Sequence, residues 1–338
     1  SLLGAASLAA AGCSRSWLIE DPPPGEGAPD AGGEATGGAT APAPDAAEAS
    51  DRAAAAAAPP LRPLAHIRGP GVPARLDEAL TRLLEPLGGM GAFVQPGQSV
   101  LIKPNLGFSK PLEYRAVTTP ALIAAVARQV LDRGAARVLV ADNPVPMAGD
   151  VFGAVGLPAT LQGLPVTLMN AGDDGRWVET PVPQGQEFDR REVLAEALEA
   201  DVHIALPIAK SHSGAGFTGA LKGMMGLIRS RIDFHMRHDL HQAIVDLNTV
   251  LKPDLVILDG LEVMATGGPG GPGELVRCDS LIASADPVAA DAAGVRLAPL
   301  FGRPVDPERI RHLHLARAQG LGYIELPAEQ RHEISMPA

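Results

Sequence analysis

Short apolar runs alternate with longer amphipathic stretches over most of the chain, and this alternation constrains the fold more than any other feature of the sequence. The runs have the length of strands buried on both faces, and the stretches between them repeat their apolar residues with the period of a helix. The sequence therefore predicts an α/β fold, with a mostly parallel, doubly wound sheet and helices on both faces. Strands are expected at Ser99–Ile102, Ala136–Val140, Val166–Met169, Val202–Leu206, Leu255–Leu258 and Leu281–Ala283. Helices are expected at Pro73–Leu87, Pro120–Arg133, Arg190–Glu199, Thr218–Ile228, Asp233–Leu251, Pro287–Leu297 and Pro307–Gln319.

The first 63 residues do not share this pattern. Leu2–Gly12 is apolar but too short to cross a bilayer, and it ends at Cys13 like the end of a signal peptide with a bacterial lipobox. Residues 14–63 are rich in Pro, Ala and Gly and predict a disordered linker. We therefore expect a signal and lipobox remnant at 1–13, the linker, and a single large domain at 64–330. The protein is expected to be exported and lipid-anchored on the periplasmic face of a membrane, with a plain secretory signal as the alternative.

The charged residues argue against a nucleic-acid-binding function and make the few lysines candidate site residues. The net charge of −11, without a basic stripe, makes nucleic acid an unexpected partner. Only Cys278 accompanies Cys13, so cysteines of this domain can form neither an internal disulfide nor an iron–sulphur cluster. Among 28 basic residues only five are lysines, which in an arginine-rich chain suggests sites that need a compact ammonium group. They are Lys103, Lys110, Lys210, Lys222 and Lys252.

Lys103 and Asn105 follow a predicted strand, at the edge where ligands bind in parallel sheets. Thr119 and Pro120 then suit the first positions of a helix, whose N-terminus favours anions. Asp259 ends a later predicted strand. We expect Lys103, Asn105, Thr119 and Asp259 to bind substrate; the alternative is a solvated lysine beside an ordinary helix cap.

A second polar group lies in residues 206–223. Lys210 and His212 follow a predicted strand, and a glycine-rich turn leads to a helix with Thr218 as the expected cap. Lys222 falls in the first turn of that helix, where a cation opposes the helix dipole. A lysine there needs a ligand or a carboxylate beside it; the alternative is a solvated lysine. We expect Lys210, His212 and Lys222 to be catalytic and to share one cleft with Lys103 and Asn105.

A histidine-rich segment follows. His238 and His241 are spaced one helical turn apart and could share a divalent metal with His212 or a carboxylate, or could form a solvated cluster. At least one of the two is expected to line the cleft of His212. The glycine-rich segment 267–273 predicts either a flap over the site or a plain surface loop.

Five linked motifs resemble the domain of unknown function family 362 over residues ~65–325. They are Leu101–Asn105, Lys210–Lys222, Asp239–Asn248, Pro253–Gly260 and Ser284–Asp291. The resemblance implies a bacterial or archaeal α/β domain, often exported, without an established activity. Some relatives carry a ferredoxin-like module whose cysteines this chain lacks. The family often has a further lysine where this chain has Ile208, whereas Lys210 and His212 match.

These observations predict an enzyme that binds a small anionic substrate at a Lys/Asn/His cleft. The lysines would hold a carboxylate or phosphate, and His212 or His238 would be a general acid or base near neutral pH. A divalent metal on the histidines is the one cofactor the sequence suggests. The alternatives are a non-catalytic lipoprotein that binds a metal or anion, and an accessory subunit of a membrane redox system.

Overall fold

A computed structural model describes residues 59–145 and 148–338, and most of its strands belong to one sheet. The strand order is β12-β1-β11-β10-β7-β2-β3-β4, with β8 paired to β10 and β9 to β8. Every ladder of that eight-strand path is parallel except the two that β11 forms, with β1 and β10. β5 and β6 form a separate hairpin. The strands are β1 (Leu64–Arg68), β2 (Ser99–Pro104), β3 (Arg137–Asp142), β4 (Thr167–Asn170), β5 (Trp177–Pro181), β6 (Arg190–Leu194), β7 (Val202–Leu206), β8 (Ile208–His212), β9 (Gly216–Thr218), β10 (Leu255–Met264), β11 (Leu275–Ser284) and β12 (Arg331–Ser335).

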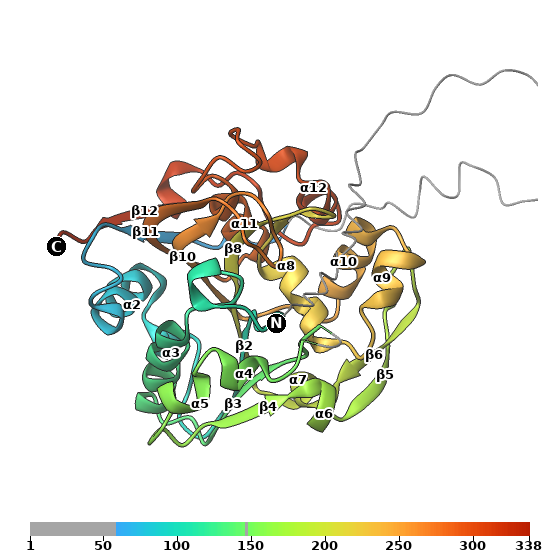
Figure 1. Cartoon of the computed structure of the whole chain (residues 1–338), viewed down its shortest axis with the longest axis horizontal. Coiled ribbons are helices and arrows are strands. Elements are labelled where there is room, and N and C mark those ends of the chain that lie inside the picture. Colours follow the sequence, from blue (N-terminus) through green and yellow to red (C-terminus); the bar gives the residue numbers. More distant parts are fainter. Residues whose placement is uncertain (1–58, 146–147) are drawn as a thin grey trace, which may run out of the picture. The chain divides into compact units, whose positions relative to one another are not determined.

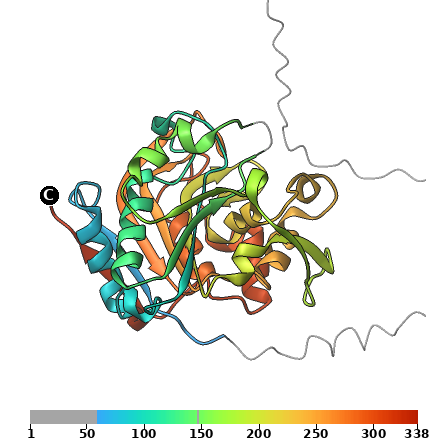
Figure 2. The same cartoon turned by 90° about the horizontal axis from the view of Figure 1, so that it is seen from below.

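Helices cover both faces of the sheet, which confirms the predicted α/β class (Figure 1). Seen from below, the blue and green helices of the first half lie on one side of the strands, and the yellow to red helices on the other (Figure 2). The helices are α2 (Leu76–Leu84), α3 (Pro120–Asp132), α4 (Val151–Ala154), α5 (Leu157–Thr160), α6 (Ala171–Asp174), α7 (Ala195–Glu199), α8 (Ala220–Gly223), α9 (Ile232–Met236), α10 (Leu240–Asn248), α11 (Pro287–Val295) and α12 (Arg311–Ala318).

The alternation of side chains along each strand builds two separate cores. In β10, Leu255 and Ile257 pack into the core beside α2 and α3, whereas Val256 and Leu258 pack into the core beside α10 and α11. Because successive residues of a strand point to opposite faces, a strand buried on both faces must be apolar at every position. This explains why the strand signal in the sequence is a continuous apolar run.

Two predicted helices are wrong in part. Residues 190–199 form strand β6 followed by the short helix α7, because residues 190–194 pair with β5. Residues 233–251 form two helices, α9 and α10, because the Asp239 side chain accepts hydrogen bonds from the backbone N–H groups of His241 and Gln242 and so starts a new helix. Strands β1, β5, β8, β9 and β12 were not predicted, and β12 carries the sheet beyond residue 330.

The predicted signal, lipobox and most of the linker fall in residues 1–58, outside the described residues. Residues 59–63 have no regular secondary structure. Within the described ranges, no helix combines the length and apolar character needed to cross a membrane.

Ile257 lies fully buried in β10, and truncating it tests the two-sided core. We expect Ile257→Ala to lower the free energy of unfolding by about 2–5 kcal/mol, through lost burial and an unfilled cavity. Val178→Ala, at an exposed residue, is the control and should have little effect. Urea unfolding followed by circular dichroism measures both, and an unchanged stability of Ile257→Ala would contradict the core assignment.

Candidate functional site

Five of the residues predicted from the sequence line one narrow pocket at the carboxyl ends of β2, β3 and β7. They are Lys103, Asn105, Lys210, His212 and Lys222. The cavity has a volume of about 40 Å³. A water molecule needs roughly 10–15 Å³ on the same measure, so the space suits a few waters or a group as small as a carboxylate. Three of the five lysines of the chain are therefore gathered at one place.

The β8–β9 hairpin aims Lys210 and His212 into this pocket. The two residues are separated by one position in β8, so both side chains leave the same face of the strand. Thr218 of β9 pairs with Lys210 and also lines the pocket. Ser211 points the other way, and its hydroxyl accepts a hydrogen bond from the backbone N–H of Gly268. Lys210 and His212 thus belong to a strand, where the sequence predicted a loop.

Lys103 is neutralised within the protein. Its ammonium lies 2.9 Å from a carboxylate oxygen of Asp142, at the end of β3, and both side chains are almost fully buried. Asp142 also accepts hydrogen bonds from the backbone N–H groups of Leu106 and Asn143. Burial lowers the pKa of Lys103, and Asp142 opposes this effect. Gly226 packs against the pair so closely that a Cβ atom there would overlap both side chains.

Lys210 is fully buried and has only uncharged partners. Its ammonium donates to the Asn105 side-chain oxygen (3.3 Å), to the Pro269 carbonyl oxygen (2.9 Å) and to the Ala116 carbonyl oxygen, and it lies 4.9 Å from the centre of the Phe108 ring. Burial, and then the charge of Lys222, lower the pKa of Lys210 to about 7. Because Pro269 belongs to the glycine-rich segment, this loop closes over the buried lysine.

Lys222 is partly buried on the short helix α8 and has no hydrogen-bond or ion-pair partner among the described residues. Burial, Arg231 and Lys103 lower the pKa of Lys222 to about 7. The start of α8 is held by Asp291, which accepts hydrogen bonds from the backbone N–H groups of Ala220 and Leu221 at 2.6 and 3.0 Å. The predicted cap Thr218 is wrong, since Thr218 ends β9 and Gly219 precedes the helix.

His212 is held as a neutral ring. Its Nδ1 atom accepts hydrogen bonds from the backbone N–H groups of Gly214 and Ala215, both at 3.1 Å. Burial and then the charge of Lys222 lower the pKa of His212 to about 2. A neutral imidazole whose Nδ1 is an acceptor carries its proton on Nε2, so His212 can donate a hydrogen bond from that atom.

Three further residues lie around the pocket and were not predicted from the sequence as site residues. Asp142 comes two residues after the predicted strand Ala136–Val140 and could have been found by that position, whereas Arg231 carries no signal in an arginine-rich chain. The Arg231 guanidinium donates to the backbone oxygen of Asn143. His235 stacks on His212, with the ring centres 6.2 Å apart.

Thr119 and Asp259 do not line the pocket. Thr119 starts α3, but instead of capping the helix its hydroxyl donates to the fully buried carboxylate of Asp259, as does its backbone N–H. Arg115 lies 3.6 Å from the same carboxylate and donates to the Thr119 hydroxyl. This network joins the loop after β2 to β10.

His238 and His241 also lie away from the pocket lining. His238 precedes α10, so the expected spacing on one helix is wrong, and its Nε2 atom is 2.9 Å from the Arg191 guanidinium. His241 stacks on His312 with the ring centres 5.7 Å apart. In the described part of the chain, no three His, Cys, Asp or Glu residues form a group that could hold a metal ion.

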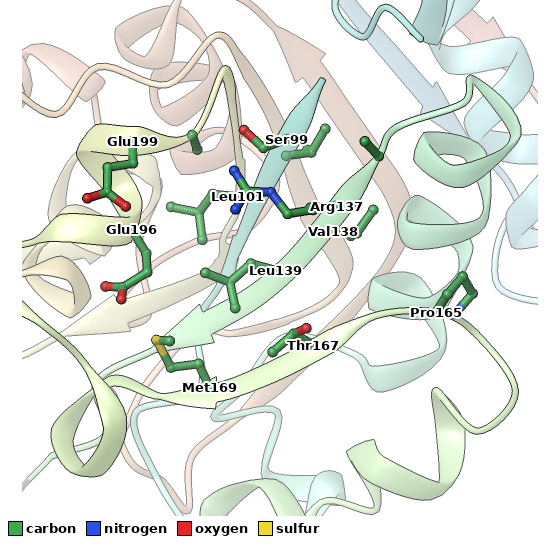
Figure 3. Close-up of a pocket in the computed structure, with 13 residues that line it drawn as sticks. Ser99, Leu101, Arg137, Val138, Leu139, Pro165, Thr167, Met169, Glu196 and Glu199 are labelled. Atoms are coloured by element: carbon green, nitrogen blue, oxygen red, sulfur yellow. The ribbon is translucent and has the colours of Figure 1, made fainter. Parts of the chain in front are cut away.

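A larger cavity of about 330 Å³ lies towards the amino ends of β2, β3 and β4 (Figure 3). Most of its lining residues are apolar, and three of the polar ones are paired with residues that do not line it. Glu196 and Glu199 bind Arg176, and Ser99 binds Asp201. Because ligands of parallel sheets bind at the carboxyl ends of the strands, the smaller lysine pocket is the better candidate for chemistry.

Comparison with known proteins gives one matching family model, described as domain of unknown function (DUF362), over residues 100–296. A thylakoid-associated protein of Synechocystis sp. is 33% identical over 223 residues, which cover 63% of this chain and 67% of that protein.

Two solved structures are also similar, each at a low TM-score. One is the lactate racemase apoprotein of Thermoanaerobacterium thermosaccharolyticum, with a TM-score of 0.41 and 15% identity, over 64% of this chain and 53% of that one. The other is a protein of Thermotoga maritima, with a TM-score of 0.37 and 13% identity, over 72% of this chain and 58% of that one. This chain therefore spans little more than half the length of either.

The hydrogen bonds of His212 predict a ring that stays neutral from pH 5 to 8, with its proton on Nε2. We expect its ¹⁵N signals, assigned by their loss in His212→Ala, to keep one protonated and one unprotonated nitrogen across this range. An ordinary histidine would titrate near ~6.5. A titration of His212 in this range, or a proton on Nδ1, would contradict the geometry.

Proposed function

The chain belongs to the DUF362 family, and we propose that it is an enzyme that binds a small anionic substrate in the pocket formed by Lys210, Lys222 and Arg231. The observation that carries the proposal is an excess of positive charge. Four cationic side chains line the pocket with one carboxylate, Asp142, which already pairs with Lys103. No carboxylate of the pocket balances the charges of Lys210, Lys222 and Arg231, and buried charges are costly unless paired, so these charges favour an anion in the cavity.

The hydrogen-bonding groups of the pocket support the same conclusion. The Thr218 hydroxyl is buried and has no hydrogen-bond partner within the described part of the chain. A buried hydroxyl without a partner costs free energy, and an oxygen of a bound anion would satisfy it. The Nε2–H group of His212 is a further neutral donor at the same pocket. Cations and neutral donors directed at one small cavity are typical of carboxylate or phosphate recognition.

We assign different roles to the polar groups. His212 is a hydrogen-bond donor, because burial lowers its pKa to about 2 and removes it from acid–base chemistry near neutral pH. Lys222 is the proton-transfer group, because its pKa is lowered to about 7 and its ammonium has no partner among the described residues. A catalytic group works best with a pKa near the working pH. Arg231 is the permanent positive charge of the site.

We expect sulfate and glycolate to bind the purified protein, with an affinity that falls about tenfold between pH 6 and pH 8. The pKa of Lys222 is lowered to about 7, and an anion prefers its protonated form, so binding weakens as pH rises through 7. Isothermal titration calorimetry measures the affinity, since neither probe titrates in this range.

Arg231→Gln should weaken glycolate binding by about tenfold to a hundredfold, because it removes a charged partner of the anion. The matched control is Arg237→Gln, on an exposed side chain of the same segment, and it should bind like the original protein. Equal binding by both variants, or no binding of either probe by the original protein, would overturn the proposal.

We further propose that the protein is exported and held at the periplasmic face of a membrane by acylation of Cys13. Support comes from the sequence motif alone, which lies outside the described residues. In a bacterial host, Cys13→Ser should move the full chain from the membrane fraction to the soluble periplasmic fraction. Cys278→Ser is the control and should stay with the membranes. Membrane association that does not depend on Cys13 would count against the lipid anchor.

A further inference from the structure

Lys222 differs from the other cations of the pocket, because its nitrogen is free. Lys103 is paired with Asp142, the ammonium of Lys210 donates to three oxygens, and Arg231 donates to a backbone carbonyl oxygen. Lys222 has no such partner among the described residues, although it lines the same cavity. An amine with no hydrogen-bond partner keeps its lone pair available once it loses its proton.

The short helix that carries Lys222 is held in place from two directions. Asp291 binds the backbone N–H groups at its start, and Gly219 packs so tightly against Asp291 that a Cβ atom there would overlap the carboxylate. Asn248 of α10 donates a hydrogen bond to the backbone oxygen of Leu221 at 2.8 Å. The backbone on both sides of Leu221 is therefore fixed, and with it the origin of the Lys222 side chain.

The surroundings of Lys222 favour its neutral form. Burial is the largest cause, followed by the charges of Arg231 and Lys103, and together they bring the pKa of Lys222 to about 7. A partly buried amine next to other cations is the environment that makes lysine a nucleophile towards carbonyl groups. A lysine that is half deprotonated at neutral pH is, in contrast, a poor permanent anchor for an anion, and Arg231 is already present for that purpose.

We propose that Lys222 forms an imine with a small oxo acid, that is, a carboxylate with an aldehyde or ketone beside it. The inference rests on the proposed anion site, with Arg231 holding the carboxylate. The neutral donors His212 and Thr218 line the same cavity and are available to the carbonyl oxygen.

The reaction balances without an oxidant or reductant. The Lys222 nitrogen attacks the carbonyl carbon, a C–N bond forms, and the π electrons of the carbonyl group move to oxygen. The oxygen then leaves as water with the two hydrogens of the amine, and a C=N double bond remains. The imine withdraws electrons from the carbon next to it, so this site would act on bonds of that carbon.

Borohydride trapping tests the imine directly. The full-length protein is incubated with glyoxylate or pyruvate, reduced with sodium borohydride, digested and examined by peptide mass spectrometry. We expect saturable, stoichiometric labelling of the peptide that contains Lys222. The exposed Lys110 and Lys252 of the same chain report non-specific labelling, which should stay low and rise linearly with concentration. Glycolate and lactate, which lack the carbonyl group, should give no label.

The rate of trapping adds a second readout. At saturating oxo acid it should rise as pH increases through 7, because the amine is the reactive form, while the affinity for glycolate falls over the same range. Lys222→Met should lose the saturable label, and Lys252→Met should keep it. Glycolate binding without saturable labelling of Lys222, or labelling of Lys210 in its place, would overturn the imine and leave the anion site intact. Absence of glycolate binding would overturn the proposed function itself.

Discussion

Ammonium groups that are removed from water must find compensation, and this requirement governs how the chain is arranged at the carboxyl ends of β2, β3 and β7. Lys103 is compensated by Asp142, and that ion pair joins β2 to β3. Lys210 is compensated by three oxygens, two from the segment between β2 and α3 and one from Pro269 of the glycine-rich segment. The two lysines thus draw the loops around the pocket together. Lys222 is left without a partner, which makes it the reactive member of the group.

Burial in the same pocket separates the roles of the polar groups. Burial gives Lys210 and Lys222 pKa values of about 7, and it gives His212 a pKa of about 2. Lysine, which usually keeps its positive charge near neutral pH, therefore becomes titratable in this range. Histidine, which usually titrates in this range, stays neutral. The histidine acts through its geometry, because two backbone N–H groups occupy Nδ1 and leave the proton on Nε2. From the usual pKa values of the two residue types alone, histidine would be the proton-transfer group and lysine the group of fixed charge.

Several elements of the fold follow directly from the sequence, and others do not. β2, β3, β7 and β10 were recognisable as continuous apolar runs, since both of their faces are buried. β5 has no buried residue and β6 is buried only at Val193 and Leu194, so neither strand is a continuous apolar run. Their pairing with each other outweighs the helical pattern of residues 190–199. The division of residues 233–251 depends on one aspartate, because the side chain of Asp239 starts α10. That change removed His238 from the helix and with it the expected spacing of the metal pair.

By itself the sequence determined the α/β class and the gathering of Lys103, Asn105, Lys210, His212 and Lys222. Parallel strands place their carboxyl ends at one edge, so polar residues that follow separate strands meet there. Only the tertiary structure decided which charges cancel and which remain. Contacts between segments far apart in the chain pair Lys103 with Asp142, place Arg231 at the pocket and leave Lys222 without a partner. No residue spacing in the sequence indicates such contacts, because they form only when burial brings the segments together.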